Sequence, residues 1–249
     1  MDDTRRTVSL APAATATLVA MDAADGLVGV TAHCDVDREV PVVGGWLNPD
    51  LDRVDDLDPD LVLTSDALQS SVRDALEARG HEVVHLAPAT LPAVIESFET
   101  LGGAVGRPEA GAALAEDARD RLARIRDRVA GRERPVVYCE EWSDPPMAAG
   151  NWVPEAVEAA GGRYPFRDPG ERSGEIAAEA VEAADPDHVV LHVCGKGDRV
   201  DPAVVEARDW DLDATVHVLH DDLLNQPSPR LLDGVEALAA RLHGVDSPA

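Results

Sequence analysis

The sequence predicts an α/β protein built of two lobes, with mainly parallel sheets and one long helix joining them. Three observations support this fold class. Short apolar segments of strand length alternate with segments of helical periodicity along most of the 249 residues. A long amphipathic stretch at 109–131 separates two parts of similar rhythm. The combination Asp-Pro-Asp followed by a Val/Leu-rich run occurs once in each part, at 58–63 and at 185–191.

The stretch at 109–131 is predicted to be a single helix. Pro108 precedes its first turn and Gly131 follows its end, as helix caps favour. Its apolar residues are spaced by threes and fours, as on one face of a helix: Leu114, Ala118, Leu122, Ile125 and Val129. A helix of about 22 residues is roughly 33 Å long. We therefore expect a spine helix at 107–131 between an N-terminal lobe at 1–106 and a C-terminal lobe at 132–249.

The N-terminal lobe is expected to alternate strands and helices, which is typical of a parallel sheet with crossover helices. Its predicted strands are 7–10, 27–31, 61–63 and 82–86. Its predicted helices are 15–21, 51–57, 68–79 and 92–101. The pair Gly102-Gly103 is expected to bend the chain towards the spine helix.

The C-terminal lobe repeats this rhythm. Its predicted strands are 135–139, 188–191 and 216–219, and its predicted helices are 152–160, 173–184 and 230–242. Residues 141–150 are expected to form a loop. The two Asp-Pro-Asp segments favour lobes of like construction, although two unrelated helix-to-strand joints with the same punctuation would give the same pattern.

The charge is strongly negative, with 48 acidic and 22 basic residues and a net charge of −26. Such a surface repels nucleic acids and anionic membranes, so both are poor partners. The acidic residues are spread along the whole chain. This favours a solvated acidic coat of the kind that halophilic proteins carry over a local cation-binding surface.

Neither a membrane span nor an export signal is visible in the sequence. No apolar run approaches the roughly 20 residues that cross a bilayer, and no signal-peptide apolar region opens the chain. We therefore expect no membrane insertion. The chain as it stands is expected to be cytoplasmic, or extracytoplasmic if a leader has been removed.

The cysteines and glycines give no known catalytic or metal motif. Cys34, Cys139 and Cys194 lie far apart and without CxxC spacing, which argues against a disulfide framework and a zinc site. Gly195-Lys196-Gly197 is too short for a phosphate-binding loop.

The residues that follow the strands are the first candidates for a ligand site, because ligands of parallel α/β sheets bind at the carboxyl ends of the strands. These loops are expected to face each other across a cleft between the lobes. Trp46, Trp142 and Trp152 lie in or beside them, in a chain with only 3% aromatic residues. With Pro145, Pro146 and Met147 they would make an apolar wall for a flat ligand. The alternative is that these tryptophans fill the cores of the lobes.

Several of these segments resemble the class III periplasmic binding proteins of ABC importers, and most closely the vitamin B12 (cobalamin) binding proteins. The similar segments are VSLAPAAT at 8–15, LVGVTAHCD at 27–35, PDLVL at 59–63, DPPMAAG at 144–150, VPEAVEAAGG at 153–162 and SPRLLDGVEAL at 228–238. Their order and spacing cover nearly the whole chain. The resemblance implies two Rossmann-like lobes bridged by one long helix, with a corrinoid held between them.

The resemblance also implies positions for the ligand contacts. His33 stands where the corrinoid binders have a ring-contacting aromatic residue, and Trp46 where they have a tryptophan. The loop from Trp142 to Asn151 matches the wall of the second lobe. The expected ligand-binding residues are Pro12, His33, Cys34, Trp46, Asn48, Ser65, Trp142, Asp144, Pro146, Asn151, Trp152 and Leu224.

The chain departs from the family pattern in two places. Leu223 and Leu224 stand where the family has bulky aromatic residues. Ser70 and Asn225 stand where the transport proteins have the glutamates that dock on the ABC permease. The second departure weakens the expectation of a permease partner.

His33 is also a candidate metal ligand, because imidazole binds transition metals and can take an axial position on cobalt. Packing against the ligand or hydrogen bonding to it is the alternative role. A Cys34/His33 catalytic pair is disfavoured, since adjacent residues at a strand end point in opposite directions. The expected function is therefore non-enzymatic binding of cobalamin or a related corrinoid. A corrinoid-handling factor or enzyme that uses His33, Cys34 and Glu141, or a binder of another metal chelate such as a siderophore, are the alternatives.

Overall fold

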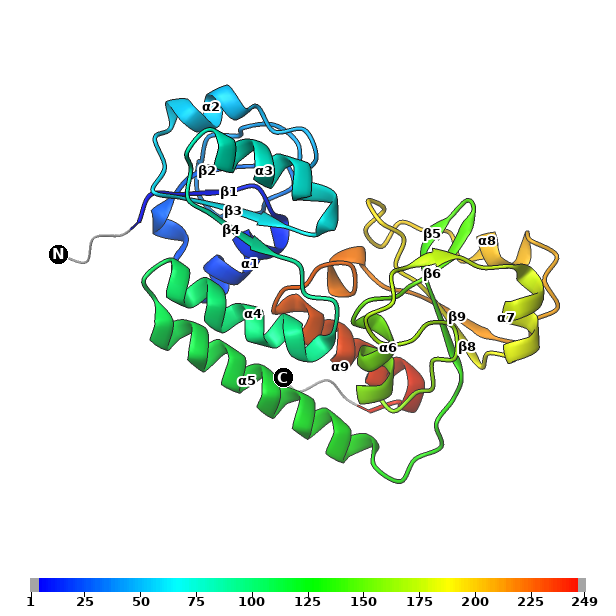
Figure 1. Ribbon diagram of the computed structural model, residues 1–249. Helices are drawn as coiled ribbons and strands as arrows, with labels where there is room; N and C mark the ends of the chain where they lie inside the picture. The colour runs from blue at the N-terminus through cyan, green and yellow to red at the C-terminus, as the bar shows by residue number, and fades with distance from the viewer. Residues whose placement is uncertain (1–4, 246–249) are drawn as a thin grey trace. The chain divides into compact units, whose positions relative to one another are not determined.

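The computed structural model describes residues 5–245 (Figure 1). The chain forms two compact units. Unit 1 comprises the residues up to Pro88 together with Ile95–Asp117, and unit 2 comprises Ala89–Val94 together with the residues from Ala118 onward. The divisions fall within two helices, α4 (Leu91–Ala104) and α5 (Pro108–Val129), so each helix contributes residues to both units.

Unit 1 is organised around a four-stranded parallel sheet of order β2-β1-β3-β4. The strands are β1 (Thr7–Ser9), β2 (Leu27–Val30), β3 (Leu61–Ser65) and β4 (Val83–Leu86). The helices are α1 (Pro12–Ala20), η1 (Ala24–Gly26), α2 (Leu51–Asp56), η2 (Ala67–Gln69) and α3 (Ser70–Ala78). Helices α1 and α4 cover one face of the sheet, and α2 and α3 cover the other (Figure 1).

The alternation of side chains along β3 explains these two layers. Leu61 and Leu63 join the core cluster that contains Leu18 of α1 and Leu101 of α4. Val62, which points to the opposite face, joins the cluster that contains Leu76 of α3. Because both faces are covered, the strand reads as a continuous apolar run in the sequence.

Unit 2 contains a mixed five-stranded sheet of order β7-β6-β5-β8-β9. Its strands are β5 (Val137–Ser143), β6 (Pro146–Ala148), β7 (Gly174–Glu175), β8 (His188–Leu191) and β9 (Thr215–Val218). Strands β5, β8 and β9 are parallel, whereas β6 and β7 are antiparallel additions at one edge. The helices are α6 (Val153–Ala159), α7 (Ala178–Ala184), α8 (Ala203–Glu206), η3 (Asp221–Leu223) and α9 (Arg230–His243).

The α/β fold class is confirmed, and α5 has the apolar face that the sequence predicts. Ala118, Leu122, Ile125 and Val129 are buried along it, and Leu114 is half-buried. Among the described residues, no helix is both long and apolar enough to cross a membrane.

Three expectations about local structure are wrong. The predicted loop at 141–150 is largely a hairpin of β5 and β6, and the predicted helix at 173–184 begins only at Ala178, because Gly174 and Glu175 pair with β6. Gly102 and Gly103 do not bend the chain, since α4 continues to Ala104. A Cβ on Gly102 would lie 2.8 Å from the Cα of Gly111, so this glycine permits close packing of α4 against α5.

Candidate functional site

The carboxyl edge of the unit 1 sheet is formed by the chain that follows β1, β2 and β3. After β2, the chain forms a turn that is closed by a bridge between Gly44 and Pro49. Gly44 has φ of +118°, a conformation that favours glycine. At the tip of this turn, Trp46 is half-buried and Leu47 is 50% exposed. The turn therefore presents an apolar surface to its surroundings.

The predicted site residues of unit 1 differ in exposure. His33 and Asn48 are exposed, and Pro12 is half-buried at the start of α1. Ser65 is buried, and its backbone N–H donates a hydrogen bond to Oε1 of Gln69 at 2.7 Å. The side chains of His33 and Asn48 are thus accessible, whereas that of Ser65 is not.

Cys34 is turned into unit 1. Its Sγ lies 3.2 Å from Oγ1 of Thr31 and 3.8 Å from the carbonyl oxygen of Ser9. It also lines a pocket of about 640 Å³ with the apolar side chains of Val30, Val36, Val40 and Val42. Neither hydrogen-bond partner is a base that activates a thiol, so the geometry gives no support to Cys34 as a nucleophile.

A buried amide, absent from the predicted site, organises this edge of unit 1. Nε2 of Gln69 donates to the carbonyl oxygens of Leu10 at 3.0 Å and of Trp46 at 2.6 Å, while Oε1 accepts from Ser65. These partners follow β1, follow β2 and end β3, respectively. The sequence carries no signal for this role, because a single glutamine beside a helix start is ordinary.

The carboxyl edge of the unit 2 sheet carries the β5–β6 hairpin. Trp142 is 47% exposed, and its Nε1 donates to the carbonyl oxygen of Asp144 at 2.8 Å. Asp144 is exposed and precedes a cis peptide bond to Pro145. Pro146 is half-buried and pairs with Ser143. Trp142 and Asp144 are therefore accessible on this hairpin.

Two predicted contact residues of unit 2 lie in its interior. Trp152 is 7% exposed, and its Nε1 donates to the carbonyl oxygen of Leu224 at 2.7 Å. The side chain of Leu224 is fully buried. Asn151 is half-buried with φ of +53°, and its carbonyl oxygen accepts from the backbone N–H of Gly170. In this structure Trp152 and Leu224 pack the core, which is the alternative role that the sequence left open for the tryptophan.

A buried ion pair fixes the base of the hairpin. Glu140 of β5 is fully buried, and Arg208 donates to its two carboxylate oxygens at 2.6 and 2.8 Å. Tyr138 and Ser143 donate to the same carboxylate at 3.1 and 2.7 Å. The hydrogen bonds with Glu140 raise the pKa of Arg208, and burial raises the pKa of Tyr138. The sequence signal was a glutamate at the end of the apolar run PVVYCE, but its distant partner could not be read from it.

His192 and Asn225 form a second buried polar pair. Nδ1 of His192 is hydrogen-bonded to Oδ1 of Asn225, and Nδ2 of Asn225 donates to the carbonyl oxygen of His192 at 2.9 Å. Burial lowers the pKa of His192. Asn225, at one position expected to dock on a permease, thus directs its amide into unit 2. At the other position, Oγ of Ser70 donates to the carbonyl oxygen of Ala67 at 2.7 Å.

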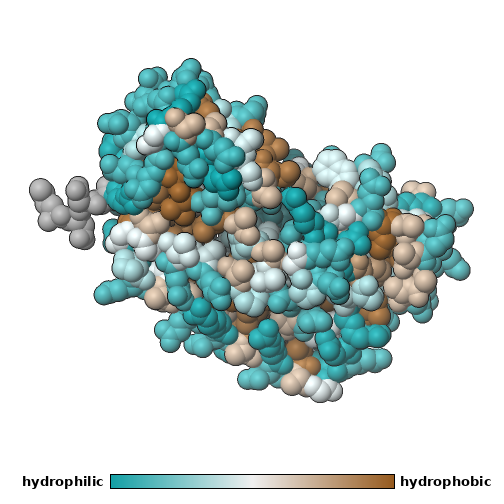
Figure 2. Space-filling view, viewed as in Figure 1, coloured by the Kyte–Doolittle hydropathy of each residue, from teal (hydrophilic) through white to brown (hydrophobic). Residues whose placement is uncertain are grey.

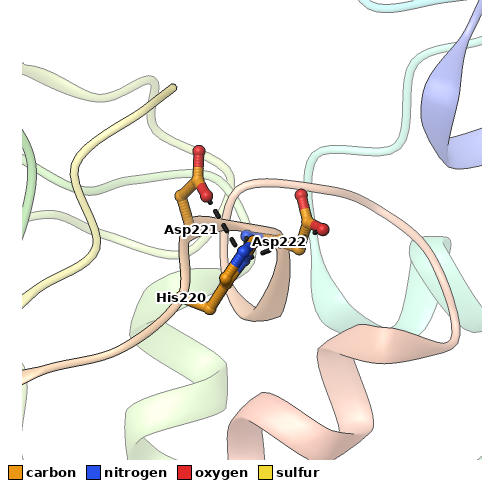
Figure 3. Close-up of side chains that lie close together, drawn as sticks. All are labelled: His220, Asp221 and Asp222. Carbon is orange, nitrogen blue, oxygen red and sulfur yellow. Dashed lines mark hydrogen bonds and ion pairs between the residues drawn. The ribbon is translucent and has the colours of Figure 1, made fainter. Parts of the chain in front are cut away.

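Within residues 5–245, the side chains that approach a metal-binding arrangement are His220, Asp221 and Asp222 (Figure 3). The carboxylates already accept hydrogen bonds within unit 2. Asp221 accepts from the backbone N–H groups of Gly195 and Gly197, and Asp222 accepts from Arg230. These hydrogen bonds connect the segments around Gly195 and Arg230 to η3. The geometry of the cluster alone does not make a metal site.

Comparisons with proteins of known sequence place this fold in a family. Residues 7–215 match the periplasmic binding protein family. The cobalamin-binding protein of Halobacterium salinarum is 28% identical over 257 residues, which cover 96% of this chain and 69% of that protein. The vitamin B12-binding protein of Vibrio cholerae is 28% identical over 249 residues, which cover 95% of this chain and 88% of that protein.

Solved structures agree with this assignment. The periplasmic vitamin B12 binding protein BtuF of Vibrio cholerae superposes with a TM-score of 0.78 at 26% identity, covering 96% of each chain. A periplasmic heme binding protein from Pseudomonas aeruginosa gives a TM-score of 0.79 at 25% identity, covering 99% of this chain and 95% of that one. Since the match to the family extends over most of the sequence, the chain belongs to the periplasmic binding protein family.

Proposed function

We propose that this protein binds cobalamin or a related corrinoid and acts as the ligand-binding component of a transport system. The observation that carries the proposal is similarity over 95–96% of the chain to proteins named for cobalamin and vitamin B12 binding. The non-enzymatic assignment rests on the family, whose members are binding proteins.

The exposed residues at the two carboxyl edges supply suitable chemistry. A corrinoid has a broad ring face, which aromatic and aliphatic side chains contact well, and polar groups around the ring, which need hydrogen bonds. Trp46 in unit 1 and Trp142 in unit 2 are the proposed ring contacts. His33 and Asn48 in unit 1 and Asp144 in unit 2 are exposed polar groups in the loops that follow the strands.

Cyanocobalamin binding tests the function directly. After incubation and gel filtration, we expect the protein fraction to be red, with a saturable heat of binding in calorimetry. A colourless protein with no heat of binding would sink the corrinoid proposal. Two variants then separate the loss of a ring contact from the loss of core packing. Trp142→Phe alters an exposed side chain and is expected to weaken cyanocobalamin binding. Val181→Ala alters a side chain that is buried in α7 and is expected to lower stability without changing a ligand contact.

Heme is the second candidate ligand. The similarity to the Pseudomonas aeruginosa heme binding protein at 25% identity favours it, and both ligands are flat metal-containing macrocycles. Hemin and a ferric siderophore should therefore be titrated beside cyanocobalamin under the same conditions. If hemin binds more tightly than cyanocobalamin, heme replaces cobalamin as the proposed ligand, and the proposed role as a carrier protein is retained.

His33 is the proposed axial ligand if the protein coordinates the metal. Its side chain is exposed, so the imidazole is sterically available. Imidazole nitrogen is a suitable ligand for cobalt. With His33→Ala, we expect the visible absorbance bands of bound aquocobalamin to shift. Unchanged bands with unchanged affinity would refute coordination and leave binding intact.

The proposed partner is an ABC permease, and the proposed location is outside the cytoplasmic membrane, as the family name implies. Ser70 and Asn225 carry no charge, and Asn225 is held by His192. We therefore expect docking to use other surface residues. Ser70→Ala should leave binding to the permease unchanged in a pull-down with permease vesicles, and a large loss would restore the predicted docking position.

A further inference from the structure

Unit 1 exposes two leucines beside the Gln69 hydrogen bonds. Leu47 is 50% exposed and follows Trp46, and Leu68 is 55% exposed and precedes Gln69. Because Nε2 of Gln69 donates to the carbonyl oxygen of Trp46 at 2.6 Å, the backbone segments that carry these leucines are held together. Apolar side chains are visible at the surface of this unit near α3 in Figure 2.

The backbone before Leu68 has an uncommon conformation that a hydrogen bond closes. Asp66 has φ of +69°, an uncommon conformation for a residue with a side chain. Its carboxylate accepts a hydrogen bond from the backbone N–H of Leu68 at 2.8 Å. Gln69, which directly follows Leu68, is fully buried. This short segment thus buries a polar amide and exposes an aliphatic side chain, the reverse of the usual preference.

We infer that Leu47 and Leu68, positioned by Gln69, form an apolar contact patch for the macrocycle of the bound ligand. This inference rests on the proposed function and extends it to residues outside the predicted site. Both leucines lie at the carboxyl edge of the parallel sheet, where ligands of such sheets bind. Leu47 follows the proposed ring contact Trp46 in the chain, and Leu68 precedes the glutamine that binds the carbonyl oxygen of Trp46.

The role of Gln69 is positioning rather than contact. All three of its hydrogen bonds go to backbone atoms, of Leu10, Trp46 and Ser65. It therefore fixes the path of the turn at 44–49 relative to η2 without depending on the side chains there. Without the amide of Gln69, the segments that carry Leu47 and Leu68 are no longer joined by this hydrogen bond. Ligand binding then has to order the turn at 44–49, which has an entropic cost.

The first test measures cyanocobalamin affinity of Leu47→Ala and Leu68→Ala. Each leucine is half exposed, so covering the remaining surface accounts for about a fivefold change in affinity. We expect each variant to bind about fivefold more weakly. Val19→Ala is the matched control, since Val19 is 42% exposed on α1 of the same unit and is expected to leave affinity unchanged.

The second test examines Gln69→Met by hydrogen exchange and calorimetry. We expect the amide of Ser65, which donates to Oε1 of Gln69, to exchange at least about tenfold faster. The amide of Asp50, which closes the turn by donating to Val43, should also exchange faster, while those of Val62 and Leu63 in β3 keep their rates. Cyanocobalamin affinity should fall, and the fall should not add to that of Leu47→Ala, because both act through the same turn. Ser70→Ala is the control beside Gln69.

The outcomes separate the patch from the function. If the wild-type protein does not bind cyanocobalamin, the proposed function and the patch both fail. If the wild type binds and both leucine variants bind as tightly as Val19→Ala, the patch alone is refuted. Faster exchange in Gln69→Met with unchanged affinity would refute the positioning role of Gln69. Since the leucine variants alter surface residues, this result does not depend on whether Gln69→Met folds.

Discussion

The two carboxyl edges of this protein are stabilised in opposite ways. In unit 1, a neutral amide, Gln69, holds three backbone segments and leaves Leu47 and Leu68 exposed. In unit 2, a buried ion pair of Glu140 and Arg208 holds the hairpin, and Trp152 lies inside the unit. Both edges follow parallel strands, so a position after a strand determines neither exposure nor the kind of stabilisation.

This difference has an energetic consequence. A neutral amide that loses a partner leaves unpaired dipoles, whereas a buried carboxylate that loses its arginine keeps an uncompensated charge. We therefore expect unit 2 to be the more sensitive of the two edges to a single substitution. The four predictions below test this comparison, from the largest expected effect to the smallest.

Arg208→Met is expected to give the largest loss. It leaves Glu140 buried without its counter-charge, which costs about 3–5 kcal/mol of unfolding free energy. Urea unfolding measures it. The exposed pair of Arg53 and Asp50 provides the control, since Arg53→Ala is expected to cost less than about 1 kcal/mol. The double variant Glu140→Leu/Arg208→Met should recover part of the loss, and an equal cost for Gln69→Met in unit 1 would contradict the comparison.

Trp152→Phe is expected to cost about 2–4 kcal/mol, from a smaller side chain in the core and an unpaired carbonyl oxygen at Leu224. Thermal and urea unfolding measure this loss. Wild-type stability in this variant would mean that Trp152 is not a packing residue, and its role as a ligand contact would then return.

Acidification is expected to destabilise unit 2 through His192. Burial lowers its pKa, so between its folded value and about 6.5 the unfolded chain binds a proton that the folded chain does not. This contribution to stability is complete above about pH 6.5 and is lost as the pH falls towards the folded pKa. Burial also lowers the pKa values of His85, His188 and His217, which act in the same direction.

The measurement is the urea midpoint at pH 7.5 and pH 5.5 for the wild type and His192→Asn. Because the difference in proton uptake arises only below about pH 6.5, the variant should lose up to about 1.4 kcal/mol less over the last pH unit of this range. A change between the two pH values as large as in the wild type would exclude His192 as a source of the dependence.

Trp142→Phe is expected to have the smallest effect on stability. Trp142 is 47% exposed, so the change should remain within about 0.5 kcal/mol by urea unfolding. Its effect should instead be on the ligand, with cyanocobalamin affinity a few-fold weaker. A stability loss as large as that of Trp152→Phe would remove the distinction between the exposed and the buried tryptophan of unit 2.

The fold was largely predictable because its signals are local. Apolar runs such as Leu61–Leu63 and the apolar spacing along 109–131 arise from burial on a strand or a helix, and they are visible in consecutive residues. The wrong predictions lie where strand pairing with distant residues determines the local structure. Strands β6 and β7 are short and at the sheet edge, and a strand of two or three residues has no periodicity to read.

For the candidate site, the sequence indicates only a location, the loops that follow the strands. The sequence itself determined the α/β class, the order of most elements and the set of loops that follow the strands, since these depend on periodicity and on chain direction. Only the tertiary structure decided that Trp142 is exposed and Trp152 buried, that Asn225 forms hydrogen bonds with His192, and that Gln69 joins three backbone segments. These facts depend on contacts between residues 23–72 positions apart, which no local pattern encodes.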